Sequence, residues 1–335
     1  MPSLTDSLGR PLVDLRVSVT DRCNFRCRYC MPREHFGQGF EFLPKGQILS
    51  FEEIARLSAV FVKLGVEKIR LTGGEPLMRS ELPVLVGMLK RIAGLELAMT
   101  TNGALLDRHA AALARAGLDR LTVSLDALDD ETFRRMSDAE VPVARVLAGI
   151  EAALEHGFVP PKLNTVIRRG VNEHSILDLV RRFRGTGHVV RFIEYMDVGT
   201  TNGWCLDHVV PAREIVARID AAYPLESVGD APIGRIARRY RFVDGAGEIG
   251  VIASVTEPFC QGCTRARLSA DGRLFTCLFA AVGTDFRSPL RDGTDDAGLA
   301  RRIAAVWERR ADRYSELRSE DKRRLPRAEM SYLGG

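Results

Sequence analysis

Six of the seven cysteines in this chain fall into two groups of three. The first triad is Cys23, Cys27 and Cys30, spaced C-x3-C-x2-C, and the second is Cys260, Cys263 and Cys277, spaced C-x2-C-x13-C. An odd number of cysteines without an apparent secretion signal argues against a disulfide framework. The grouping therefore indicates two metal sites, and we expect Cys205 to be a free thiol outside them.

The first triad can support redox chemistry. Three thiolates this close in sequence can bind three irons of a 4Fe-4S cubane, which leaves the fourth iron without a protein ligand. The amino and carboxylate groups of S-adenosylmethionine could chelate that iron, and one-electron reduction would then release a 5'-deoxyadenosyl radical. The alternative is a zinc site in which His35 supplies the fourth ligand.

The second triad allows the same two interpretations. It could be a zinc knuckle completed by Cys205 or a histidine, or a second 4Fe-4S cluster whose open iron faces a substrate. Arg265 and Arg267 lie between its cysteines, in a segment with strand character. Alternation along a strand would place both guanidinium groups on one face, where they would suit a phosphate chain.

The elements around these residues alternate between strands and helices. Short apolar runs predict strands at 15–20, 67–72, 96–101, 120–126, 161–167 and 188–194. Between the first two, residues 50–64 have a helical stripe of apolar side chains, and Ser50 with Glu53 forms a capping box. Alternation of this kind predicts parallel strands joined by right-handed crossovers.

The positions of the unusual residues favour a barrel over a doubly wound sheet. The first triad, the Gly73-Gly74-Glu75-Pro76 sequence, Thr101 and Ser124 all follow or end a predicted strand. In barrel enzymes the active site lies at the carboxyl ends of the strands. The predicted fold class is α/β, a partial (βα)6 TIM-like barrel at 1–235 with a smaller C-terminal domain at 236–335.

Composition restricts the class of protein. The 335 residues are 45% hydrophobic, which is enough for a substantial core, and the formal net charge is only +4. No apolar run is long enough to span a membrane, and a basic stripe with interleaved aromatics, as in nucleic-acid binders, is missing. We expect a cytoplasmic protein without membrane or nucleic-acid partners, and a non-enzymatic metalloprotein that binds nucleic acid is the less favoured class.

Seven segments together carry a family resemblance. They are DLRVSVTDRCNFRCRYCMP, IRLTGGEPLMR, TTNG, VSLDA, RFIEYM, FCQGCTRARLSADGRLFTCLF and the terminal Gly334-Gly335. The triad with the glycine pair is typical of the radical S-adenosylmethionine superfamily, and the whole set resembles its MoaA family. These are the GTP 3',8-cyclases of molybdenum cofactor biosynthesis, lyases that form (8S)-3',8-cyclo-7,8-dihydroguanosine 5'-triphosphate.

The resemblance implies a role for each matching residue. Tyr29, Gly74, Ser124 and Met196 would contact S-adenosylmethionine, and Arg16, Arg70, Thr101, Lys162, Arg265, Ala266 and Arg267 would contact GTP. Gly334, Gly335, Arg265 and Arg267 would act in catalysis, and each triad would bind a 4Fe-4S cluster. The implied partners are an electron donor and a downstream cyclic pyranopterin-forming enzyme, and the resemblance allows a homodimer. The alternative is a radical enzyme with an auxiliary cluster that acts on a peptide.

Overall fold

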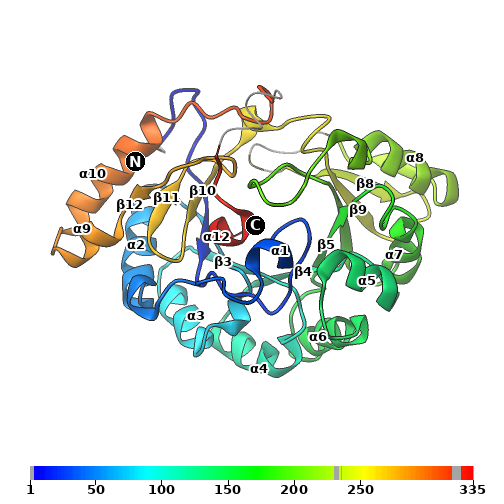
Figure 1. The fold of residues 1–335 in the computed structure, drawn as a ribbon, viewed down its shortest axis with the longest axis horizontal. Coiled ribbons are helices and arrows are strands. Elements are labelled where there is room, and N and C mark those ends of the chain that lie inside the picture. The colour runs from blue at the N-terminus through cyan, green and yellow to red at the C-terminus, as the bar shows by residue number, and fades with distance from the viewer. Residues whose placement is uncertain (1–3, 230–233, 235, 319–325, 335) are drawn as a thin grey trace.

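A twelve-stranded sheet curves around the centre of the molecule, with helices along its outer side (Figure 1). The computed structural model describes residues 4–229, 234, 236–318 and 326–334. The strands follow the order β12-β11-β10-β1-β2-β3-β4-β5-β6-β9-β8-β7. Within the described ranges β7 and β12 form no pairing with each other, so the sheet is a partial barrel.

The first six strands are parallel and adjacent in chain order. They are β1 (Asp14–Ser18), β2 (Lys68–Thr72), β3 (Glu96–Thr101), β4 (Arg120–Ser124), β5 (Lys162–Ile167) and β6 (Val189–Glu194). The helices of this part are α1 (Arg33–Phe36), α2 (Phe51–Lys63), α3 (Leu82–Lys90), α4 (Leu106–Ala116), α5 (Asp130–Ser137), α6 (Val143–Glu155), α7 (Ser175–Phe183) and α8 (Ala212–Ala222). The six strands expected from the sequence are therefore confirmed.

The later strands extend this sheet at both ends. β9 (Glu248–Ile252) pairs parallel to β6, and β10 (Arg265–Leu268) pairs parallel to β1. Antiparallel strands complete the edges, namely β7 (Leu225–Ser227), β8 (Arg238–Phe242), β11 (Arg273–Phe275) and β12 (Thr284–Asp285). The predicted boundary at residue 235 thus falls between segments that share one sheet, and it stays a prediction.

The remaining elements are short turns and C-terminal helices. The 3-10 turns are η1 (Lys45–Gln47), η2 (Pro76–Met78), η3 (Leu206–His208) and η4 (Cys260–Gly262), and the helices are α9 (Arg287–Arg291), α10 (Asp296–Glu308) and α12 (Met330–Leu333). In Figure 1 α10 lies outside the sheet, whereas α12 lies near the centre of the ring. The chain end is thereby brought to the carboxyl ends of the central strands.

Helix α2 forms where the sequence predicts it. Ser50 Oγ accepts a hydrogen bond from the Glu53 amide at 3.1 Å, and Glu53 Oε2 accepts one from the Ser50 amide at 2.7 Å. This capping box satisfies amides that the first helical turn leaves unpaired. Ile54, Leu57 and Phe61 are buried, and each contributes about 1.5–3 kcal/mol of apolar burial.

The two faces of the sheet differ in polarity. In β1, Leu15 and Val17 are buried in the apolar layer beneath the helices, while Arg16 between them points into the ring. The structure therefore places polar and charged side chains inside the partial barrel and the hydrophobic core around it. None of the helices in the described ranges is long and apolar enough to cross a bilayer.

Candidate active site

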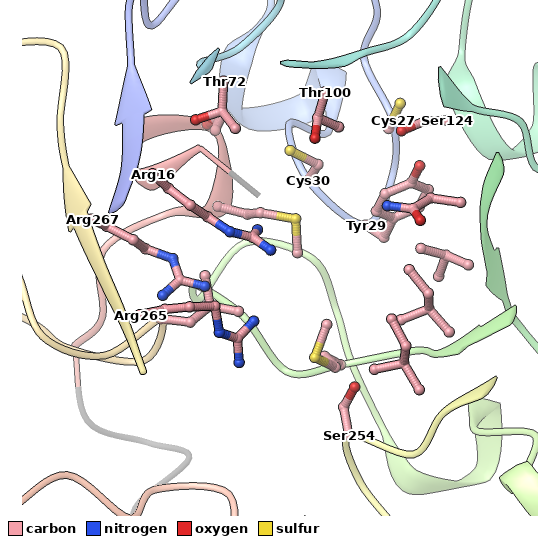
Figure 2. A pocket seen from close by; sticks show the side chains of 18 of the residues that line it. Arg16, Cys27, Tyr29, Cys30, Thr72, Thr100, Ser124, Ser254, Arg265 and Arg267 are labelled. Carbon is pink, nitrogen blue, oxygen red and sulfur yellow. The ribbon is translucent and has the colours of Figure 1, made fainter. Parts of the chain in front are cut away.

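Both cysteine triads face one cavity inside the ring. The cavity has a volume of about 250 Å³ and is lined by residues from the carboxyl ends of the strands, from the C-terminal part of the chain and from α12. Its lining includes Cys23, Cys27, Cys30, Cys260, Cys263 and Cys277. Figure 2 shows Cys30 and Tyr29 on one side, with the side chains of Arg16, Arg265 and Arg267 extending toward the same space.

The first triad lies in a loop directly after β1. Arg26 holds this loop by donating from its guanidinium group to Cys23 O at 2.8 Å and to Phe36 O at 2.8 Å. Burial and the neighbouring Glu75 raise the pKa of Cys23 to about 12, and burial also raises the pKa values of Cys27 and Cys30. Metal binding converts cysteine thiols to thiolates, and three cysteines on one cavity fit an iron-sulfur cluster.

The arrangement does not match a mononuclear zinc site. Among the residues that the structure describes, no group of three or more His, Cys, Asp or Glu side chains is arranged to hold one metal ion. The thiolates of a cubane bind different irons, so they lie farther apart than the ligands of one zinc ion. His35 is exposed, and it does not line the cavity. The position of His35 therefore speaks against its role as the fourth ligand of a zinc site.

The glycine pair after β2 packs against the cysteine loop. A Cβ atom on Gly73 would lie 2.6 Å from Thr20 O, and one on Gly74 would lie 2.3 Å from Arg22 O. Gly73 also has φ +152°, a conformation that side chains disfavour. The missing side chains at Gly73 and Gly74 therefore let the Gly73-Gly74-Glu75-Pro76 segment contact the backbone that leads into Cys23.

Glu75, the acid of the same motif, joins the ends of β2 and β3. Its carboxylate accepts hydrogen bonds from the Leu77 amide at 3.0 Å, Thr101 Oγ1 at 2.8 Å and the Asn102 amide at 2.7 Å. Burial raises the pKa of Glu75 to about 7 even though these bonds act in the opposite direction. Thr101, expected at the nucleotide, lines the cavity but uses its hydroxyl for Glu75.

The four residues expected at S-adenosylmethionine all line the cavity, namely Tyr29, Gly74, Ser124 and Met196. The Tyr29 hydroxyl donates to Asp126 Oδ2 at 2.8 Å, and the Val166 amide donates to Asp126 Oδ1 at 2.8 Å. Burial raises the pKa of Asp126 to about 6. Sequence reasoning missed Asp126, although its place two residues after Ser124 was the signal that could have found it.

The opposite side of the cavity is basic. Arg16, Arg265 and Arg267 extend into the cavity there, and Arg191 also lines it. Among the described residues, the buried Nε atom of each of these four arginines has no hydrogen-bond partner. Burial lowers the pKa of Arg191 to about 9 and, with repulsion from Arg265, the pKa of Arg267 to about 10. The pKa of Arg16 is lowered by burial and then by Arg267 and Arg265. Such crowding of like charges in a dry site suits an anion.

Arg191 was not identified from the sequence, and three of the expected nucleotide residues do not line the cavity. Arg70 lies beside Arg16 in the sheet and donates to Thr100 Oγ1 at 3.2 Å and Thr122 Oγ1 at 3.1 Å. Lys162 is exposed at the start of β5. The side chain of Ala266 is buried in the apolar core, which leaves only its backbone for a ligand.

The second triad is set among arginines. Burial alone would raise the pKa of Cys263, but Arg265 and Arg310 lower it to about 6. Arg265 donates to Cys263 Sγ at 3.7 Å, and the Phe279 amide donates to Cys277 Sγ at 3.5 Å. Hydrogen bonds to cysteine sulfur are a common feature of iron-sulfur sites. Cys205 does not line this cavity, in agreement with the expectation that it is a free thiol outside the two metal sites.

The C-terminal tail reaches the cavity. Met330 and Ser331 line it, and a Cβ atom on Gly334 would lie 1.9 Å from Thr72 Oγ1. The Tyr332 hydroxyl anchors the tail by donating to Asp271 Oδ1 at 2.6 Å. Gly334 therefore lies against the end of β2, next to the Gly73-Gly74 motif. Gly335 lies outside the described residues.

Two family models match most of the chain. The model described as the radical SAM superfamily matches residues 17–183, and the model described as Molybdenum Cofactor Synthesis C matches residues 188–316. In the solved structure of Streptococcus suis SuiB bound to S-adenosylmethionine, a similar fold covers 94% of this chain and 72% of that one, with a TM-score of 0.63 and 14% identity. That likeness concerns the fold alone.

Curated relatives are similar over nearly the whole length. A GTP 3',8-cyclase of Acidothermus cellulolyticus is 57% identical over 95% of this chain and 89% of the relative, and one of Xanthomonas axonopodis pv. citri is 50% identical over 99% of both. A third, of Staphylococcus carnosus, is 45% identical over 99% of both. With both cysteine triads on one cavity, this chain belongs to the GTP 3',8-cyclase family of the radical SAM superfamily.

Proposed function

We propose that this protein converts GTP to (8S)-3',8-cyclo-7,8-dihydroguanosine 5'-triphosphate in molybdenum cofactor biosynthesis. The observation that carries the proposal is the single cavity bounded by both cysteine triads, with Arg16, Arg265 and Arg267 between them. A radical generated at one triad would form within reach of a nucleotide held near the other.

The first triad would hold a 4Fe-4S cluster and, through its open iron, S-adenosylmethionine. When bound and reduced, this pair supplies the radical that removes hydrogen from the ribose C3' of GTP. Tyr29 is fixed by its bond to Asp126, and with Ser124 and Met196 it would orient the adenosyl group. Such orientation can account for much of the rate of a radical reaction, because the reacting atoms must meet in one geometry.

The second triad would hold another 4Fe-4S cluster, with three protein ligands and a free iron for the guanine edge. We infer that Arg16, Arg191, Arg265 and Arg267 neutralise the triphosphate, because each has a buried Nε without a hydrogen-bond partner in the described part of the chain. Bidentate contacts with phosphate oxygens would also fix the nucleotide relative to the first triad. The closure of C3' on C8 needs no side-chain nucleophile, so positioning and exclusion of solvent are the roles left to the protein.

Two further partners follow from this chemistry. S-adenosylmethionine cleavage and reduction of the cyclised radical both require electrons, so an electron donor must act on this protein. A downstream enzyme that forms cyclic pyranopterin would consume the product. Two thiolate-bound clusters suit a reducing compartment, and we propose the cytoplasm.

The direct test is an anaerobic assay of the reconstituted protein with GTP, dithionite and S-adenosylmethionine. We expect about eight irons per chain, 5'-deoxyadenosine and the 3',8-cyclised nucleotide. Alanine at Cys23, Cys27 and Cys30 should remove half the iron and all cleavage, whereas alanine at the second triad should remove the other half and preserve cleavage. Stoichiometric zinc without an iron chromophore would contradict the proposal. A peptide substrate remains the alternative if cleavage occurs but GTP is not consumed.

A further inference from the structure

A buried ion-paired cluster adjoins the second cysteine triad, and one of its members, Arg310, also lines the cavity. It consists of Asp6, Arg10 and Arg310, whose exposed fractions are 6%, 3% and 4%. Asp6 Oδ2 accepts from Arg10 Nε at 2.6 Å and from an Arg310 terminal nitrogen at 3.0 Å. Two arginines from opposite ends of the chain therefore share one carboxylate. Breaking such a buried pair is costly, because it leaves an uncompensated charge.

The two arginines hold the backbone at all three cysteines of the second triad. Arg10 donates to Cys260 O at 2.8 Å, and Arg310 donates to Cys263 O at 2.8 Å. Arg310 Nε also donates to Thr276 O at 3.0 Å, and Thr276 directly precedes Cys277. Carbonyls at or next to every cysteine of the triad are thus fixed by one charged unit.

Further contacts hold the cluster of Asp6, Arg10 and Arg310 in position. Arg310 stacks on the Trp307 ring with its guanidinium carbon 4.5 Å from the ring centre, and Trp307 Nε1 donates to Arg10 O at 3.2 Å. The Leu8 and Arg10 amides both donate to Asp6 Oδ1 at 2.9 Å. The N-terminal segment and the end of α10 are therefore joined beside the cysteines. Within the described residues, neither segment donates a hydrogen bond of this kind to the first triad.

We propose that Asp6, Arg10 and Arg310 are positioning residues for the second iron-sulfur cluster, an inference that rests on the two-cluster site proposed above. They orient the three cysteine-bearing segments through these hydrogen bonds, while Asp312, whose carboxylate lies 3.7 Å from Arg310 Nε, balances the remaining positive charge. Outer residues that orient metal ligands typically change metal affinity about 10- to 100-fold when they are mutated. Their hydrogen bonds and charge also influence the reduction potential of a cluster.

The test uses reconstituted full-length protein and measures each cluster separately. Arg310→Gln should retain about four of eight irons, lose the electron paramagnetic resonance signal of the second cluster and still cleave S-adenosylmethionine. Arg310→Lys keeps the charge but not the forked donors, so it should bind both clusters and release the iron of the second to a chelator about tenfold faster than wild type. The matched control is Arg309→Gln, since Arg309 is exposed and donates to Ala305 O.

The possible outcomes distinguish a failure of the positioning role from a failure of the proposed two-cluster site. Eight irons, an unchanged signal and a wild-type rate of iron release in Arg310→Gln would overturn the positioning role. If Arg310→Gln does not fold, a wild-type release rate in Arg310→Lys would overturn it instead. A wild-type protein that binds only four irons would overturn the two-cluster site itself. Loss of both clusters in Arg310→Gln at unchanged helical content would also refute a role confined to the second triad.

Discussion

At the scale of single residues, the buried arginines are the most informative part of the cavity. Arg267 is 2% exposed, and its Nε atom has no hydrogen-bond partner among the residues that the structure describes. A charged group is rarely buried unless it is paired, and the cavity that Arg267 lines leaves room for an anionic ligand to pair with it. Alternation along the strand was sufficient to predict that Arg265 and Arg267 share a face. Arg191 was missed because nothing local distinguishes it from a surface arginine of a strand.

We expect Arg267→Ala to weaken GTP binding about ten- to hundredfold. The physical reason is that a hydrogen bond to a charged group contributes about 1.5–3 kcal/mol, and 1.4 kcal/mol corresponds to a factor of ten. Both clusters should persist. Titration calorimetry under anaerobic conditions measures the affinity, and Arg241→Ala, at an exposed arginine of β8, is the matched control. Unchanged affinity after replacing both Arg265 and Arg267 would refute the phosphate role.

Lys162 gives a prediction for pH dependence. Although much of the Lys162 side chain is exposed, partial loss of solvation around its amine and repulsion from Arg191 lower the pKa of Lys162 to about 8. If Lys162 contacts GTP, as the family resemblance implies, its protonated amine attracts the nucleotide. GTP affinity is then highest below this pKa and declines as the pH rises through it. Between pH 7 and 9 the protonated fraction falls roughly tenfold, and a similar loss of affinity is expected.

The same titration with Lys162→Met provides the control. This variant should bind GTP more weakly at pH 7 and lack the wild-type decline between pH 7 and 9. Any ionisation of the nucleotide itself would appear in both proteins and can be subtracted. Identical pH profiles for the two proteins would show that Lys162 does not contact the nucleotide, in agreement with its place outside the cavity lining.

At the scale of elements, local sequence patterns predicted the strands and the helix, but not the pairing of strands that are distant in sequence. The six strands and the capped helix α2 were predicted within about two residues of their observed bounds, because alternation and caps are local signals. The sequence could not predict that β9 pairs with β6 or that β10 pairs with β1. These pairings join segments far apart in sequence, and they bring the second triad to the cavity of the first.

The contact between the C-terminal tail and β2 leads to a prediction about product formation. Gly334 has φ +72°, and an added Cβ would lie 1.9 Å from Thr72 Oγ1. Gly334→Ala should therefore displace the tail from β2 and lower cyclised product about a hundredfold, since small misplacements near reacting groups have effects of this size. Iron content and thermal stability should stay near wild type. Deletion of Gly334 and Gly335 should have the same effect.

A suitable control for the tail is Gly245→Ala. Gly245 has φ +78° but no atom within 4 Å of an added Cβ, so it tests the backbone strain without the clash. Product is measured anaerobically beside the iron count of each variant. Full activity in Gly334→Ala would exclude a role for this contact, while lost clusters would mean that the tail supports the structure rather than the reaction.

At the scale of the whole molecule, the ring places like charges at its centre. In the strand register, Arg16 of β1 lies opposite Arg70 of β2 on one side and opposite Arg267 of β10 on the other. Three arginines therefore follow one another across the sheet. Apart from burial, their mutual repulsion contributes to the lowered pKa of Arg16. Repulsion between these arginines lowers the stability of the ligand-free fold, and an anionic ligand can restore it.

Polyanions should therefore stabilise the ligand-free protein. A ligand present at a hundred times its Kd adds about 2.7 kcal/mol to the free energy of unfolding, which corresponds to a rise in Tm of several degrees. Scanning calorimetry should show this rise with GTP and with inorganic tripolyphosphate, but hardly with guanosine. The double variant Arg16→Gln, Arg267→Gln should have a higher Tm than wild type without ligand, because it relieves the repulsion, and tripolyphosphate should no longer raise it. A lower ligand-free Tm together with a retained response to tripolyphosphate would mean that these arginines support the sheet and that the polyanion binds elsewhere.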